Sequence, residues 1–291
     1  MWIILSLVSA LCDAGRMSFN KYFSRDFDTM TVAWWSTLAG MPFVAVFAAF
    51  TFESLPINNL AFLFPALWGS VAFAAGTMLL VEATKRCDLS IVAPIVAMTP
   101  IFIILWEYLL LGTLPNLQGF WGIVLIVVGA YLLNISKIRG WDVLAPFKVI
   151  LKKDGGLIPF AVAFIYSTGA TADKVALQYT DPFSFTVWLF VMSFIFITFI
   201  ILIFKREALS FDILRKAGPV AASGAVYSIN IIANIWAFAL ASASYVIAVK
   251  RTSALFGVLF GYLIFKERKI GERVLGAAVM VTGVAMLAVW G

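Results

Sequence analysis

The sequence predicts an all-α integral membrane protein with ten transmembrane helices, arranged as two inverted five-helix repeats. Three observations lead to this prediction: the composition, ten apolar runs, and a constant offset between the two halves of the chain. Of the 291 residues, 63% are hydrophobic and 12% are charged. A soluble domain has roughly 45–50% apolar and about 25% charged residues, so we expect the excess apolar surface to face lipid.

Each apolar run is long enough to cross a bilayer. A hydrocarbon core of roughly 30 Å takes about 20 residues of helix. Because backbone groups cannot stay unpaired in lipid, we expect every run to be helical. The runs are 2–22, 30–50, 62–84, 89–111, 117–135, 157–178, 183–204, 219–241, 243–265 and 271–290.

The basic residues predict the orientation. The loops after the first, third, fifth, seventh and ninth runs hold 17 of the 21 Lys and Arg residues. Basic loops stay in the cytoplasm, so we expect both termini on the extracytoplasmic side. The predicted location is the bilayer of a prokaryotic cytoplasmic membrane.

A shift of 154 residues aligns 90–134 with 244–288 without a gap, and ten positions are identical, including Gly122/Gly276 and Gly129/Gly283. Five helices in each half mean that the second half enters the membrane from the opposite side. This inverted arrangement is the one that many secondary transporters use. The expected units are a first repeat at 1–136, a cytoplasmic linker at 137–156 and a second repeat at 157–291.

Several function classes are disfavoured. The chain has no histidine, and its two cysteines, Cys12 and Cys87, show no metal-binding spacing. There is no glycine-rich phosphate loop and no paired catalytic group. We expect neither an enzyme nor a cofactor, and no nucleic acid as partner.

The stretch from Ser244 to Glu267, SYVIAVKRTSALFGVLFGYLIFKE, together with Gly276 and Gly283, resembles the EamA-type transporters of the drug/metabolite transporter superfamily. The first repeat departs from this pattern, because Thr113 stands where Glu267 stands in the second. The resemblance implies a ten-helix bundle with a central cavity lined by helices 1, 3, 4, 6, 8 and 9. It does not fix the substrate, since the superfamily carries many polar metabolites.

Polar stripes at helical spacing mark the candidate binding residues. In the first run, Asp13 and Arg16 lie on one stripe and can pair at i, i+3. They form either an internal ion pair or a direct substrate or proton site. In the eighth run, Tyr227, Asn230 and Asn234 form a second stripe, which serves either to bind a solute or to join helices.

Tyr166 belongs to a shorter stripe in the sixth run, with Asp173, for which an interfacial salt bridge to Lys174 is favoured. Trp35 is a candidate to line the cavity, although a membrane-interface position is the simpler expectation. Gly257 begins a Gly-x-x-x-Gly motif, which favours close helix packing.

Lys250 and Arg251 are the strongest candidates. Two adjacent cations in a membrane need anions, and an anionic substrate would supply one. The alternative is that they extend to the outer headgroups. On a continuous helix, Lys250 shares a face with Ser253 and Gly257, while Arg251 points about 100° away.

The leading prediction is a secondary transporter that moves a small anionic or zwitterionic metabolite by alternating access. Its partners would be this small-molecule substrate, the lipid bilayer and a coupling proton or counter-substrate. Alternatives are a flippase for a lipid-linked headgroup, an exporter of amino acids or organic cations, and a membrane scaffold that transports nothing.

Overall fold

The computed structural model describes the chain except for residues 24–25, 52–53, 88, 136–155, 205–209 and 264–273. In the described part, every regular element is a helix. The elements are α1 (Trp2–Phe23), α2 (Thr29–Thr51), α3 (Leu60–Arg86), α4 (Leu89–Val96), α5 (Thr99–Leu111), α6 (Leu117–Ile135), α8 (Ile158–Ala176), α9 (Pro182–Phe204), η2 (Phe211–Lys216), α10 (Ala217–Leu240), α11 (Ala243–Lys250), α12 (Ser253–Leu263) and α13 (Val274–Trp290). The predicted all-α class is confirmed.

The helices match the ten apolar runs in order, with α4–α5 and α11–α12 each covering one run. Seven helical segments are long and apolar enough to cross a membrane, and α6 and α13 are shorter apolar helices. The remaining element, α8, carries Asp173 and Lys174 near its end. Most of the predicted linker at 137–156 lies outside the described residues.

Two runs that were predicted to be continuous helices are interrupted. A turn at residues 97–98 separates α4 from α5, and a turn at 251–252 separates α11 from α12. Beside each turn a threonine hydroxyl donates to the carbonyl three residues earlier: Thr99 to Val96 at 2.6 Å, and Thr252 to Val249 at 2.7 Å. Such bonds compete with the helical ladder. The two turns are 154 residues apart, which is the offset of the repeat.

The packing is symmetric under exchange of the halves. α3 packs against α8, and the equivalent pair α10 and α1 is also in contact. In the same way, α8 contacts α4 and α5, while α1 contacts α11 and α12. The last helices of the two halves, α6 and α13, pack against each other. This is the pattern that two inverted five-helix repeats produce.

Repeated glycines bring α6 and α13 close together. A β-carbon on Gly122 would lie 3.2 Å from the carbonyl oxygen of Gly283, and one on Gly129 would lie 2.8 Å from that of Gly276. Because the partner number falls as the residue number rises, the two helices run antiparallel. Exchange of the halves turns one glycine contact into the other.

The close packing predicted at Gly257 is not formed. A β-carbon there would have no atom within 4 Å. The second glycine of that motif lies at the end of α12, where side-chain surroundings are not described. The prediction was wrong at Gly257 because the spacing of the glycines does not say which face of the helix meets a neighbouring helix.

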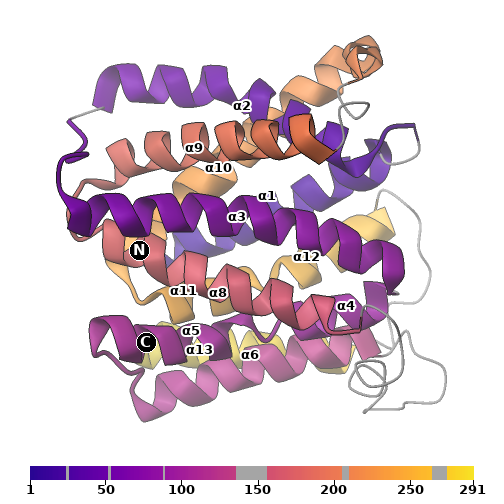
Figure 1. Cartoon of the computed structure of the whole chain (residues 1–291). Coiled ribbons are helices and arrows are strands. Elements are labelled where there is room, and N and C mark those ends of the chain that lie inside the picture. The colour runs from indigo at the N-terminus through magenta and orange to yellow at the C-terminus, as the bar shows by residue number, and fades with distance from the viewer. Residues whose placement is uncertain (24–25, 52–53, 88, 136–155, 205–209, 264–273) are drawn as a thin grey trace.

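The two termini lie at the same end of the bundle (Figure 1). The C-terminal end of α1 and the C-terminal ends of α3 and α9 lie at the other end. Three of the five loops predicted to be basic begin after these helices.

Candidate functional site

The central polar stripe of α1 contains a partly buried ion pair. Arg16 Nη2 lies 3.0 Å from Asp13 Oδ1, and Asp13 is 7% exposed. The guanidinium carbon of Arg16 also lies 6.0 Å from the ring centroid of Tyr227 on α10. The i, i+3 pairing follows the predicted spacing, and the tyrosine ring gives the arginine a second favourable contact.

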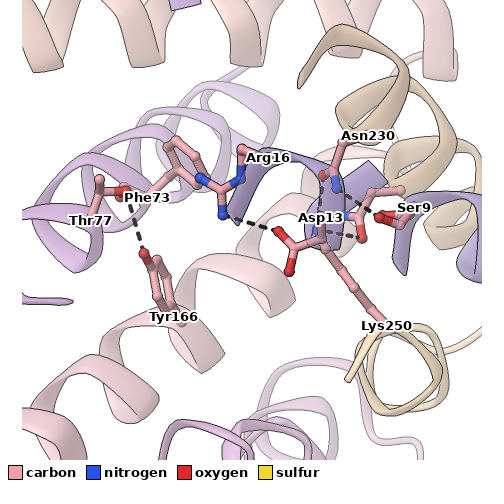
Figure 2. A network of polar contacts seen from close by, with 9 residues as sticks. Ser9, Asp13, Arg16, Phe73, Thr77, Tyr166, Asn230 and Lys250 are labelled. Atoms are coloured by element: carbon pink, nitrogen blue, oxygen red, sulfur yellow. Dashed lines mark hydrogen bonds and ion pairs between the residues drawn. The ribbon is translucent and has the colours of Figure 1, made fainter. Parts of the chain in front are cut away.

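Two amides of α10 connect α1 to α11. Asn230 Nδ2 donates to the carbonyl oxygen of Ser9 at 2.8 Å. Lys250 Nζ donates to Asn230 Oδ1 and to Asn234 Oδ1, both at 3.3 Å. Figure 2 shows Lys250 reaching from its helix toward Asn230 and Asp13. Lys250 therefore points into the bundle and does not extend to the headgroups.

Positive charge exceeds negative charge in this network. Arg16, Lys250 and Arg251 are cations, and Asp13, which is already paired with Arg16, interacts electrostatically with the other two. In the described part of the chain, no carboxylate lies within ion-pair distance of Lys250. Arg251 Nε is buried and has no hydrogen-bond partner among the described residues. Among the described residues, the network therefore carries an excess of positive charge.

The interruption of the helix changes the predicted surroundings of Lys250. It is the last residue of α11, whereas Ser253 and Gly257 belong to α12. Because the turn at 251–252 interrupts the helix, Lys250 does not share one helix face with Ser253 and Gly257. Asn230 and Asn234, which were assigned to a separate stripe, are instead its hydrogen-bond partners.

Tyr166 lies near this network, on α8. Its hydroxyl is 3.4 Å from Thr77 Oγ1 of α3, and its ring packs where Gly76 leaves space. Tyr166 also interacts electrostatically with Arg16. The structure thus brings eight of the nine candidate residues, from α1, α8, α10 and the α11–α12 turn, into one region.

Trp35 is the candidate that lies elsewhere. Its indole nitrogen donates to the carbonyl oxygen of Ser210 at 3.0 Å. Its ring packs in an apolar cluster with Phe23, Ile213 and Val220. Trp35 therefore holds the segment before α10 against α2 and does not adjoin the polar network.

Other charged side chains of the helices form contacts outside this polar network. Within α3, Glu82 forms an ion pair with Arg86 at 2.6 Å. The expected salt bridge between Asp173 and Lys174 is not formed, because Lys174 donates to the carbonyl oxygens of Phe238 and Ala241. These carbonyls lie at the C-terminal end of α10, where the helix dipole attracts a cation.

Glu107 of α5 binds the start of α11, a contact that the sequence did not indicate. Its carboxylate accepts from Ser242 Oγ at 2.9 Å and from the Ala243 amide at 2.6 Å. The hydroxyl of Ser242 does not cap its own helix. A carboxylate from another helix takes that place, so Glu107 is unavailable to neutralise Lys250.

Two surface depressions lie outside the network and are apolar. One has a volume of 280 Å³ and is lined by residues of α5, α6 and their connection, including Leu105, Tyr108 and Phe120. The other has a volume of 250 Å³ and is lined by Trp68, Trp106, Leu110, Thr168 and Ala172. Their apolar lining suits contact with lipid rather than binding of a polar solute.

Comparison with known proteins agrees with this architecture. The EamA-like transporter family matches residues 1–135 and 155–289, one stretch in each half. An "Uncharacterized transporter" of Archaeoglobus fulgidus is 22% identical over 286 residues, covering 98% of this chain and 97% of the relative. A solved crystal structure with 12% identity has a TM-score of 0.76 and covers 98% of this chain and 96% of its own, which shows a shared fold. With ten apolar helical runs, a buried polar network and a family match in both halves, the chain belongs to the EamA-like transporter family and is an integral membrane transporter.

Proposed function

We propose that this transporter carries a small anionic or zwitterionic metabolite by alternating access, and that the solute binds between α1, α10 and α11. The observation that carries the proposal is the environment of Lys250. Its ammonium is held by two neutral amide oxygens at 3.3 Å, and it has no carboxylate within ion-pair distance in the described structure.

A partly buried ammonium without an anion is costly within a membrane, because two neutral acceptors only partly replace its hydration. Arg251 and Arg16 add further positive charge nearby. A carboxylate or phosphate of the solute would supply the missing negative charge, with arginine offering paired donors and lysine a point charge. The remaining polar groups, Tyr227 and Asn234, can bind neutral parts of the solute.

The symmetric helix packing supports alternating access. In an inverted repeat, each half can adopt the conformation of the other, which exchanges the open side around a site at the middle of the membrane. The interruptions at 97–98 and 251–252 lie at equivalent positions and give each half a place to bend. We infer that the repeats are 1–136 and 157–291, that the loops on the side opposite the termini are cytoplasmic, and that the membrane is a prokaryotic cytoplasmic membrane.

The experiment is a thermal-shift screen of purified protein against anionic, zwitterionic and cationic metabolites, followed by uptake into reconstituted vesicles. A ligand at about 100 times its Kd stabilises the native state by about 2.7 kcal/mol. Anionic or zwitterionic compounds are expected to raise the melting temperature of the wild type. Lys250→Ala should remove both the shift and the uptake, and Lys250→Arg should retain part of each, because it keeps the charge but changes the geometry.

Lys216→Ala is the matched control, because Lys216 pairs with Asp26 outside the network. It should bind and transport as the wild type does. Equal stabilisation of the wild type and of Lys250→Ala by anions would contradict the site. Stabilisation by cations alone would contradict the substrate class, and a response only to lipid-linked phosphates would favour a flippase.

A further inference from the structure

Asp173 is a buried carboxyl group that the proposed anion site does not use. It lies on α8 and is 9% exposed. Its Oδ1 has no hydrogen-bond partner among the residues that the structure describes. Lys174, the adjacent cation, is bound to the carbonyl oxygens of Phe238 and Ala241 instead. Asp173 thus lacks the close cation that would compensate a buried negative charge.

Asp173 meets backbone rather than polar side chains on α3. A β-carbon on Gly69 would lie 3.0 Å from the carboxyl carbon of Asp173. Gly169, one turn earlier on α8, faces the same part of α3: a β-carbon there would lie 3.6 Å from the carbonyl oxygen of Gly69. The small residues let the two helices approach closely, and they leave the carboxyl group enclosed between them.

The charged groups around Asp173 have other partners. α8 packs against α3, α4, α5 and α11. The described titratable side chains on these elements and on α8 are Glu82, Arg86, Glu107, Tyr108, Tyr166, Lys174, Tyr245 and Lys250, with Arg251 directly after α11. Glu82 pairs with Arg86, and Glu107 binds the start of α11. Lys250 is the cation whose charge acts on Asp173, although its ammonium is bound to the amides of α10.

We propose that Asp173 is a proton-binding site: its carboxyl group is protonated in this conformation and ionises only when the helices around it rearrange. An enclosed carboxylate without a hydrogen-bond donor or a close cation is disfavoured relative to the neutral acid. The proton comes from water, as a hydronium ion protonates a carboxylate oxygen and leaves a water molecule. The use of this proton in transport rests on the proposed function, whereas its presence rests on the surroundings of Asp173 alone.

Infrared spectroscopy of the reconstituted protein tests the proposal without a substrate. A protonated carboxylic acid has a carbonyl stretching band that a carboxylate lacks. At neutral pH the wild type should show this band, and Asp173→Asn should lose it. In D₂O the band should shift slowly, because the group is enclosed. Asp173→Asn should keep the wild-type melting temperature, since its neutral side chain has the shape of the protonated acid.

Asp26→Asn is the control, because Asp26 is half exposed and paired with Lys216. It should leave the band unchanged. Gly69→Ala gives a second test that keeps the acid: its methyl group would press on the carboxyl group and should displace the band. Absence of the band in the wild type, or its persistence in Asp173→Asn, would overturn the proposal. Neither measurement uses a substrate, so a failed anion site would not be mistaken for a failed proton site.

Discussion

Replacing Glu107 with alanine should destabilise the junction between α10 and α11. Glu107 is 2% exposed, and its carboxylate accepts hydrogen bonds from Ser242 Oγ and from the amides of Ala243 and Ser244. The amides belong to the first turn of α11, which has no partner within its own helix for them. The negative charge also lies at the positive end of the helix dipole.

The magnitude follows from the three donors. Hydrogen bonds between membrane helices contribute about 0.6 kcal/mol on average and about 1.7 kcal/mol at most. Glu107→Ala should therefore lower the free energy of unfolding by about 2 kcal/mol, with an upper bound of about 5 kcal/mol. Glu107→Gln can keep Oε1, which accepts from all three donors, so it should lose less stability than Glu107→Ala.

The assay is thermal and denaturant unfolding of the purified protein in detergent, with tryptophan fluorescence as the signal that monitors unfolding. Glu82→Ala is the matched control, because the Glu82 side chain is 41% exposed and pairs with Arg86 on the surface of α3. Exposed pairs of this kind contribute at most about 1 kcal/mol. If Glu107→Ala unfolds at the same denaturant concentration as Glu82→Ala, the carboxylate does not stabilise α11 and the reasoning is wrong.

The antiparallel glycine contacts and the orientation give two further predictions. Gly129→Ala and Gly276→Ala should each cost about 1–3 kcal/mol of stability, because the added methyl groups would meet the backbone of the facing helix at 2.6 and 2.7 Å. Gly257→Ala, with open space around it, should be neutral or stabilising in a melting experiment, and an equal loss at all three sites would count against the contacts. Alkaline phosphatase fused after Gly291 should be active, since the basic loops are expected in the cytoplasm; activity of a cytoplasmic reporter there would reverse the orientation.

Much of the fold could be predicted because a lipid environment permits few backbone conformations. An apolar run of about 20 residues has to satisfy its backbone within itself, so hydropathy located the helices. Local pairs such as Asp13 with Arg16 followed from helical spacing, since both partners lie on one helix. The offset of the repeat was visible because it is preserved in the glycines that pack α6 against α13.

The interruptions of two runs could not be predicted from hydropathy. The turn at 97–98 lies within apolar sequence, and the turn at 251–252 consists of Arg251 and Thr252 inside an otherwise apolar run. The threonine bonds do not mark the turns either, because Thr168 makes the same bond to Ile165 within the continuous helix α8. Missing the second turn led to the wrong neighbours for Lys250. Its partners, Asn230 and Asn234, were recognised as a polar stripe, but the helix that this stripe would face was not.

Side chains that act between distant helices were also beyond the sequence. Glu107 was not among the candidate residues, and it binds backbone amides of another helix. Lys174 was assigned to its neighbour Asp173, whereas it binds carbonyls of α10. In both cases a charged side chain binds the unpaired backbone groups at the end of another helix. Such a contact can be recognised only when the three-dimensional arrangement of the helix ends is known.

The two glycine contacts between α6 and α13 are equivalent, because exchange of the two halves converts one contact into the other. A single five-helix unit carrying both glycines would therefore present a surface that fits an oppositely oriented copy of itself. Such a unit would need loops whose charges allow insertion in either direction, because an equal mixture of the two orientations is required for pairing. Fusing the copies into one chain removes that requirement, and it leaves each half free to acquire its own charges, as Lys250 and Arg251 show in the second half alone.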